Sequence, residues 1–357
     1  MKKSMSRSFL LNLTKIILIS GVVQAGAVLS LQGTCAAQFE PASPPIADPR
    51  DHRFDGVHED WTTPKLAGTN LRPMRPLLGA TDEEATYTLE LLCLQWRWGD
   101  PIDVYVIKPK GVKKPPVIVY QYGYPSETDY FRDERWDAAV TREGFAAVAF
   151  VTALTGHRYH DRPMKEWFVS ELQESLATSA HDVQMVLDYV AHRDDLDINR
   201  VGLFTQGSGA SIGILASAAD PRIKVLDAID PWGDWPTWMA TSPFVPEEER
   251  PAYVKPDFLK KAAVLEPIEW LPKVQAKKFR LLQTEFDDIT PAASRKKLRA
   301  AVPAGATVTV YKTQEEYAAA MIGKPQLDWI RNALRSLPEP EPDKTAAEPK
   351  APVSSSH

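Results

Sequence analysis

The positions of apolar residues along the chain predict strands that alternate with helices. Short apolar and β-branched runs recur through its middle and are typical of buried parallel strands. These runs are 87–95, 102–107, 117–120, 146–151, 200–204, 225–229, 279–283 and 307–311. Apolar residues return at helical spacing in 172–190, after Gly209 and in 325–334. The pattern predicts an α/β fold: a mostly parallel sheet of about eight strands with helices on both faces.

Both ends of the chain differ in composition from this folded part. Residues 38–74 form a polar, Pro-rich arm, and 337–357 form a tail rich in Pro, Glu, Ala and Ser. Neither has an apolar period, so both are expected to be extended or disordered. The folded domain is expected over 75–336. Within it, 231–264 is a Trp-rich insertion between two predicted strands, and it could form a pocket wall or an ordinary packed excursion.

The first 37 residues have the features of a secretory signal peptide. Basic residues precede an apolar run at 16–31, and Cys35-Ala36-Ala37 then offers small residues for a signal peptidase. A retained membrane anchor is disfavoured because the run has only about 16 residues, against roughly 20 needed to span a bilayer. A lipid anchor at Cys35 is disfavoured because the residues before it do not resemble a lipobox. The mature protein is therefore expected to be periplasmic or extracellular, without stable membrane insertion.

Composition limits the function classes further. The chain is 44% hydrophobic and 25% charged, as in globular proteins. Its formal net charge of −5, without a long basic cluster in the folded part, argues against nucleic acid as a partner and favours a small molecule. After signal cleavage only Cys93 remains, which excludes an intramolecular disulfide.

A small-residue turn at 205–210 carries the most specific chemical signal. A short strand, 200–204, leads into Thr205-Gln206-Gly207-Ser208-Gly209-Ala210, and an apolar helix is predicted to follow. This run resembles the nucleophile elbow of the α/β-hydrolase superfamily, especially its dienelactone-hydrolase, acetyl-xylan-esterase and prolyl-peptidase-like branches. The resemblance extends over nearly the whole folded domain, and it implies the α/β-hydrolase fold.

The register of this turn differs from that of a working elbow. Counting from Phe204, Gly207 stands where the resemblance implies Ser, Cys or Asp, and glycine has no nucleophile. Ser208 follows, at the position whose backbone N–H usually supplies half of an oxyanion hole. A one-residue slip would make Ser208 the nucleophile. The literal G-x-S-x-G match places Ser211 inside the following helix, where it is expected to be a decoy.

Of the other two members of the implied triad, the acid has a match in this sequence and the histidine does not. Asp287, in a loop after a predicted strand, matches the acid that orients a histidine. The histidine should follow Tyr311, but no histidine occurs between His192 and His357, and Glu316 stands closest to the expected position. Acyl transfer through a serine hydroxyl needs a base worth about 10²–10⁴ in rate. The implied triad is therefore degenerate.

A polar loop after the strand 146–151 could supply a displaced base. It contains His157 and His160, either of which could act as a base or contact substrate, and Arg158 and Arg162, either of which could hold a carboxylate. The alternative is a loop tied down by ion pairs. A metal site built from the two histidines and Asp161 is weakly supported, so no metal is expected. His181 and Asp182, on the long predicted helix, are expected to be a packing or solvated pair.

Aromatic residues near the predicted site suggest ligand contacts. Tyr122 and Tyr124 flank Gly123 after the strand 117–120, where the resemblance implies that the Tyr124 N–H faces the reacting centre. Trp232 and Trp235 could line an apolar or sugar-binding cleft, or be core residues under a lid. The glycine run at 207–209 lacks both G-x-G-x-x-G and the P-loop lysine, so no cofactor is expected.

Two functions remain open from the sequence. The first is an impaired or non-hydrolytic α/β-hydrolase-fold protein that binds a small ester, peptide or sugar derivative, as the residues at Gly207 and Glu316 suggest. The second is an active carboxylic ester hydrolase that uses Ser208 with a displaced base from His157 or His160, and with Asp287.

Overall fold

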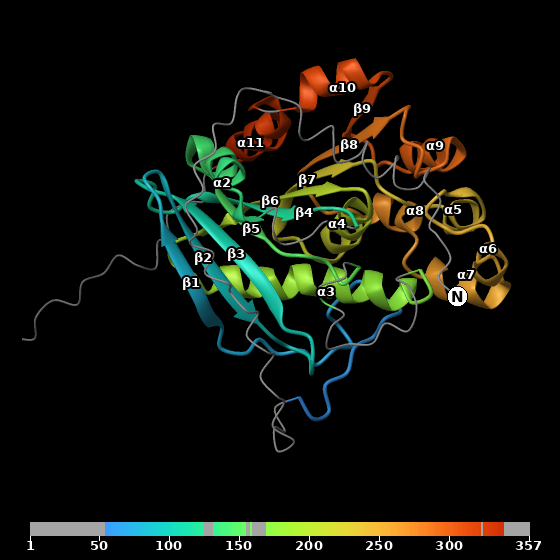
Figure 1. Cartoon of the computed structure of the whole chain (residues 1–357), viewed down its shortest axis with the longest axis horizontal. Helices are drawn as coiled ribbons and strands as arrows, with labels where there is room; N and C mark the ends of the chain where they lie inside the picture. The colour runs from blue at the N-terminus through green and yellow to red at the C-terminus, as the bar shows by residue number, and fades with distance from the viewer. Residues whose placement is uncertain (1–53, 125–130, 155–157, 159–168, 323, 339–357) are drawn as a thin grey trace, which may run out of the picture.

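A nine-stranded sheet forms the centre of the molecule (Figure 1). The computed structural model describes residues 54–124, 131–154, 158, 169–322 and 324–338. The strand order is β1-β2-β3-β5-β4-β6-β7-β8-β9. Strands β1 to β3 and the β3–β5 pair are antiparallel, and β5-β4-β6-β7-β8-β9 are parallel. The strands are β1 (Leu77–Glu83), β2 (Tyr87–Leu94), β3 (Ile102–Pro109), β4 (Pro116–Gln121), β5 (Ala146–Ala149), β6 (Asp197–Gln206), β7 (Ile223–Ile229), β8 (Lys278–Thr284) and β9 (Thr307–Tyr311).

Helices cover both faces of this sheet (Figure 1). The α-helices are α2 (Glu134–Thr141), α3 (Leu172–Ala191), α4 (Ser208–Ala219), α5 (Trp235–Thr241), α6 (Arg250–Tyr253), α7 (Pro256–Ala263), α8 (Pro267–Trp270), α9 (Ala292–Ala300), α10 (Gln314–Met321) and α11 (Asp328–Arg335). Short 3-10 turns are η2 (Arg142–Gly144), η4 (Leu271–Lys273) and η5 (Lys324–Leu327). The predicted α/β architecture with a mostly parallel sheet is confirmed.

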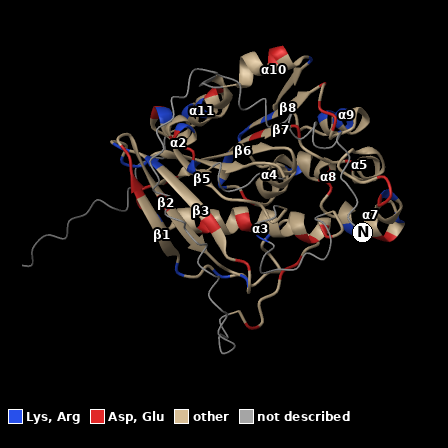
Figure 2. Ribbon diagram, viewed as in Figure 1, with Lys and Arg blue, Asp and Glu red and all other residues tan. Residues whose placement is uncertain are grey.

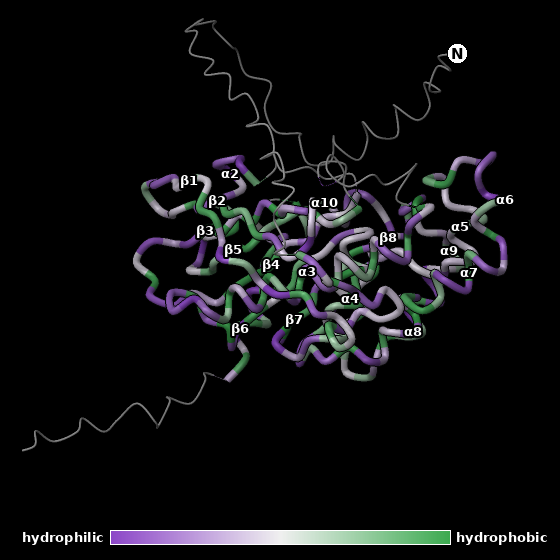
Figure 3. The backbone as a smooth tube through the Cα atoms, turned by 90° about the horizontal axis from the view of Figure 1, so that it is seen from below, coloured by the Kyte–Doolittle hydropathy of each residue, from purple (hydrophilic) through white to green (hydrophobic). Residues whose placement is uncertain are grey.

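The alternation of side chains along the strands builds two apolar cores. In β4, Val117 and Val119 belong to the core beneath α3 and α4, whereas Ile118 and Tyr120 belong to the core beneath α2 and α11. Charged residues mark the outward helices α7, α9 and α10 in Figure 2. The hydropathy colouring in Figure 3 shows apolar stretches inside the layers and hydrophilic ones mainly along the outline.

Strand β1 and the arm extend the predicted fold. All seven residues of β1 are exposed, so the strand has no alternation for sequence analysis to detect. The described part of the arm, 54–74, has little regular secondary structure but packs beside α3. The Trp-rich insertion folds into α5, α6 and α7. Trp232 and Trp235 are buried there, which favours the packed excursion over an open wall.

Candidate functional site

A sharp turn at Gly207 joins β6 to α4. Gly207 has φ 56° and ψ −125°, a conformation that non-glycine residues adopt only at a cost. Its N–H donates to the Ile229 carbonyl at 2.9 Å, and its carbonyl accepts from the Ala210 N–H at 3.0 Å. This is the sharp strand-to-helix turn that a nucleophile elbow requires. Gly207 is the residue at the corner itself.

Ser208 is the first residue of α4 and not the corner residue. Its Oγ accepts a hydrogen bond from the Tyr124 N–H at 2.8 Å. Ser208 is only 1% exposed. The Tyr124 N–H, which the resemblance implies would face the reacting centre, is therefore bonded to the Ser208 hydroxyl. That hydroxyl is not exposed to solvent.

The corner is pressed against the turn that follows β4. A Cβ at Gly209 would lie 2.5 Å from the Gln121 carbonyl oxygen, and a Cβ at Gly123 would lie 3.0 Å from the Gln206 carbonyl oxygen. Position 209 requires glycine because the start of α4 contacts the backbone at Gln121 there. Ser211 lies inside α4, as predicted for a decoy, and its Oγ donates to the Trp232 carbonyl at 2.7 Å.

Asp287 follows β8 and is held by backbone donors. Its two carboxylate oxygens accept from the Ile289 N–H at 2.9 Å and the Thr290 N–H at 3.2 Å. Burial raises the pKa of Asp287 above the ordinary value of an aspartate. The loop position predicted for the acid is therefore occupied by a well-ordered aspartate.

A second carboxylate, Asp230, lies beside the Asp287 loop. Its oxygens accept from the Thr284 N–H at 2.7 Å and the Thr284 hydroxyl at 3.1 Å. Burial, and then the negative charge of Asp287, raise the pKa of Asp230 to about 8. Asp230 has a positive φ of 45°, which is uncommon outside glycine. Sequence reasoning missed this residue, although an aspartate directly after an apolar strand was a usable signal.

The position expected for the histidine is used for helix capping. The Glu316 carboxylate accepts from the Lys312 N–H at 2.8 Å, and the Thr313 hydroxyl accepts from the Glu316 N–H at 3.2 Å. This exposed arrangement is a form of capping box at the start of α10. Sequence analysis did not single out Tyr317. Its ring packs edge-on against Phe286, the residue before Asp287, with ring centroids 5.9 Å apart. Burial and then Asp230 raise the pKa of Tyr317.

The polar loop after β5 is described only at Arg158. His157, His160, Asp161 and Arg162 lie outside the described residues. The Arg158 guanidinium is buried and donates to Asp182 at 2.6 Å and to Asp100 at 2.6 Å. The hypothesis that Arg158 holds a ligand carboxylate is wrong, because carboxylates of the chain itself saturate it. Asp182 and His181 are also buried, so of the two expectations for this pair, packing is confirmed and solvation is wrong.

Aromatic residues surround the corner unequally. The Trp232 Nε1 atom is 3.5 Å from the point where a Cβ on Gly207 would stand. The Tyr122 hydroxyl accepts from Trp136 Nε1 at 3.0 Å, and the Tyr124 ring packs against Phe244. Trp235 instead donates its N–H groups to Glu266 and to the Leu265 carbonyl. The structure thus brings Trp232, Tyr122 and Tyr124 toward the corner, whereas Trp235 bonds to Leu265 and Glu266, just after the insertion.

The described residues contain neither a metal-binding cluster nor a membrane-spanning helix. No group of three or more His, Cys, Asp or Glu side chains in that part of the chain could hold a metal ion. No helix within the same residues is both long and apolar enough to cross a bilayer.

Comparisons with known proteins identify the fold. No protein-family model matches the sequence, and no curated protein matches it. Among solved structures, an acetyl xylan esterase from a Thermoanaerobacterium species is 14% identical, with a TM-score of 0.56 over 75% of this chain and 89% of its own. An acetyl xylan esterase from a Paenibacillus species is 15% identical, with a TM-score of 0.56 over 74% and 90%.

A third similar structure belongs to another kind of hydrolase. The S-formylglutathione hydrolase of Agrobacterium tumefaciens is 11% identical, with a TM-score of 0.52 over 72% of this chain and 99% of its own. These likenesses, the mostly parallel sheet and the corner between β6 and α4 lead to one conclusion: the chain has the α/β-hydrolase fold.

Proposed function

We propose that this protein binds a small ester, peptide or sugar derivative at the Gly207 corner without forming a covalent acyl intermediate on serine. The observation that carries the proposal is the positive φ of Gly207, at the sharp turn between β6 and α4. A side chain at this corner would be the nucleophile of the fold, and glycine has none. The neighbouring turns bring the Tyr124 backbone and the Trp232 ring close to this corner, which supports ligand binding there without an attacking group.

Ser208 is poorly arranged to replace that nucleophile. Its hydroxyl is bonded to the Tyr124 N–H, and the side chain is buried. Attack on an ester also requires a base within hydrogen-bond reach of the hydroxyl. Within the part of the chain that the structure describes, the hydrogen bonds of the histidines are to other groups, such as Glu59 for His181 and the Asp188 carbonyl for His192.

The second candidate is a carboxylic ester hydrolase that uses Ser208 with His157 or His160 as a displaced base. It is favoured by the names of the similar structures, several of which are esterases. Ser208 also begins α4, where the helix dipole stabilises negative charge. In this alternative, the Tyr124 N–H would have to leave Ser208 when substrate binds.

Aryl-ester hydrolysis and covalent labelling separate the two functions. We expect the mature protein to hydrolyse 4-nitrophenyl acetate no faster than Ser208→Ala, and to gain no label from a fluorophosphonate. Labelling of Ser208, with turnover lost in Ser208→Ala and in His157→Ala or His160→Ala, would instead establish the displaced-base hydrolase.

Binding requires a separate measurement. Acetanilide, a dipeptide amide and acetylated xylose serve as probes, and saturable binding of at least one is expected by calorimetry. Gly207→Ala should weaken it, because the added methyl enters the corner. Gly305→Ala is the matched control, since Gly305 also has a positive φ but nothing within 4 Å of an added Cβ. If no probe binds, or if both variants bind equally, the ligand-binding proposal fails.

We also propose that the protein is exported and loses residues 1–37. The proposal rests on the basic start, the apolar run and the small residues at 35–37. Amino-terminal sequencing of protein from the periplasm or medium should begin at Gln38. Recovery of the full-length chain in the cytoplasm or the membrane fraction would contradict it.

A further inference from the structure

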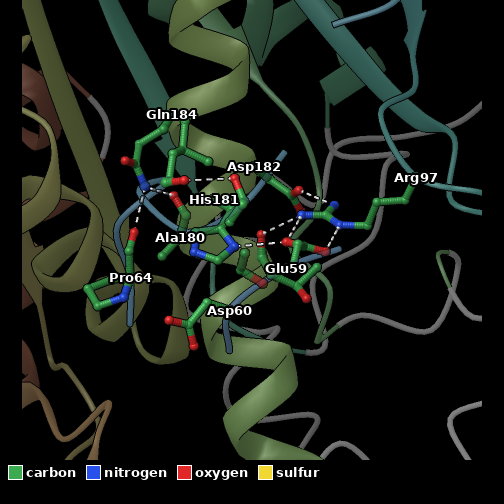
Figure 4. Close-up of polar contacts among 12 residues, drawn as sticks. Glu59, Asp60, Pro64, Arg97, Ala180, His181, Asp182 and Gln184 are labelled. Atoms are coloured by element: carbon green, nitrogen blue, oxygen red, sulfur yellow. Dashed lines mark hydrogen bonds and ion pairs between the residues drawn. The ribbon is translucent and has the colours of Figure 1, made fainter. Parts of the chain in front are cut away.

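The arm lies along α3 and is held there through its backbone carbonyls. The Gln173 side chain donates to the Trp61 carbonyl at 3.0 Å, and the Gln184 side chain donates to the Pro64 carbonyl at 2.7 Å (Figure 4 shows the second contact). Trp61 itself is 38% exposed, and a cavity of about 320 Å³ remains between the arm and Trp96. Leu66 and Leu71 of the arm also pack against the apolar core, so apolar packing and specific polar contacts together hold the arm.

His181 is the central contact, and both of its ring nitrogens face acceptors. Nδ1 is 2.8 Å from a Glu59 carboxylate oxygen, and Nε2 is 3.1 Å from the Thr63 carbonyl oxygen (Figure 4). Neither an ionised carboxylate nor a carbonyl can donate a hydrogen bond, and a neutral imidazole has only one N–H. The His181 side chain is completely buried. Both contacts are therefore satisfied together only when the ring carries two protons.

The charges around His181 give an independent reason for that second proton. Arg97 and Arg158 are ion-paired with Asp100 and Asp182, so these four groups sum to zero without the arm. Docking of the arm adds Glu59, which accepts from the Arg97 guanidinium at 2.6 Å and contributes one negative charge. A buried unbalanced charge is costly. A positively charged His181 restores the balance.

The state of Glu59 is consistent with this arrangement. Burial alone would raise its pKa, but the hydrogen bonds from His181 and Arg97 hold the pKa below the ordinary value of a glutamate. Asp60, from the arm, adds a further negative charge near the ring, and Asp182 is the next residue along α3. The charged groups facing His181 are thus Glu59, Asp60, Asp182 and Arg97.

We propose that docking of the arm onto α3 takes up one proton at His181, so that the arm is a proton-coupled strap. The inference does not depend on the proposed function of the Gly207 corner. Docking also joins the arm to the segment after β5, because Asp182 bridges Arg97 and Arg158. Release of the arm removes the negative partner that Arg97 has in Glu59, and it frees the helix face that holds the carbonyls of the arm.

Two measurements on the mature protein test this proposal. Nitrogen NMR of the histidine rings at neutral pH should show both His181 nitrogens protonated. Hydrogen exchange of arm amides, corrected for the intrinsic effect of pH, should show the docking equilibrium weakening as the pH rises, by up to about tenfold per pH unit, as the uptake of one proton on docking requires. A neutral His181 ring in the docked state, or arm protection that is constant from about pH 6 to 9 across the ordinary range of histidine, overturns the proposal.

Variants separate a docking effect from a folding effect. His181→Gln can still donate one hydrogen bond, and it should remove the pH dependence of arm protection across the neutral range. Glu59→Gln changes only the arm, so the core should remain folded while arm protection falls. His192→Gln is the matched control on the same helix, because His192 bonds to the Asp188 carbonyl and not to the arm. A pH dependence that is equal in the wild type and in His181→Gln would also contradict the proposal.

Discussion

Gly207 and Gly209 illustrate two different reasons for a glycine within one turn. Gly207 needs freedom of φ, because its positive φ lies at a corner where a side chain would still have 3.5 Å of clearance. Gly209 is required for steric reasons, because a Cβ there would clash with the carbonyl groups of Gln121 and Tyr122. The sequence showed both glycines but not which constraint applied to which.

This difference predicts unequal losses of stability. Gly207→Ala should lower the free energy of unfolding by about 1–3 kcal/mol through backbone strain alone. Gly209→Ala should lower it further, because backbone atoms must move to relieve the clash. Urea unfolding monitored by circular dichroism measures both values. A Gly209→Ala loss equal to or smaller than that of Gly207→Ala would contradict the assignment.

At the scale of elements, α10 shows why the residue at the expected histidine position could not be assigned a role from the sequence. Glu316 has the right place in the sequence for a base, yet its carboxylate caps the start of α10. Thr313-x-x-Glu316 was itself a readable capping pattern. The arm is the opposite case: its composition indicates an extended segment, and only the fold reveals that α3 donates to its carbonyls.

Capping predicts how variants at the start of α10 behave. Thr313→Ala should cost about 1 kcal/mol of stability, within the usual range of 0.5–2 kcal/mol for loss of an N-cap. Glu316→Gln should cost less, and it should leave the binding of the ester, peptide and sugar probes unchanged. Thermal unfolding and calorimetry test the pair. Loss of probe binding in Glu316→Gln would show that this residue belongs to the site after all.

At the scale of the whole molecule, buried and paired carboxylates set the response to pH. Burial tends to raise the pKa of Glu90, but Arg193 and Lys108 outweigh it, so the pKa is lowered. The same two cations lower the pKa of Asp195. Such groups stabilise the fold above the ordinary carboxylate pKa, and this stability is lost as the pH falls. Asp230 acts in the opposite direction, because its pKa is raised to about 8.

The raised pKa predicts a loss of stability as the pH rises from the ordinary aspartate pKa to about 8. Asp230 binds its proton more tightly in the folded chain than in the unfolded chain, so its contribution is present at low pH and fades as the pH rises toward about 8. Asp230→Asn should remove this decline and become more stable than the wild type at about pH 9. Urea unfolding from about pH 4 to 9 provides the comparison. Parallel curves for the two proteins would contradict the prediction.

The sequence by itself determined the α/β class, eight of the nine strands, the long helix α3 and the glycine corner, because periodicity and turn chemistry are local properties. Tertiary structure decided the rest. It placed Asp230 next to Asp287, buried Ser208 against Tyr124, committed Arg158 to Asp100 and Asp182, and laid the arm on α3. Each of these joins residues far apart in the chain, and no local pattern records which distant groups share a buried space.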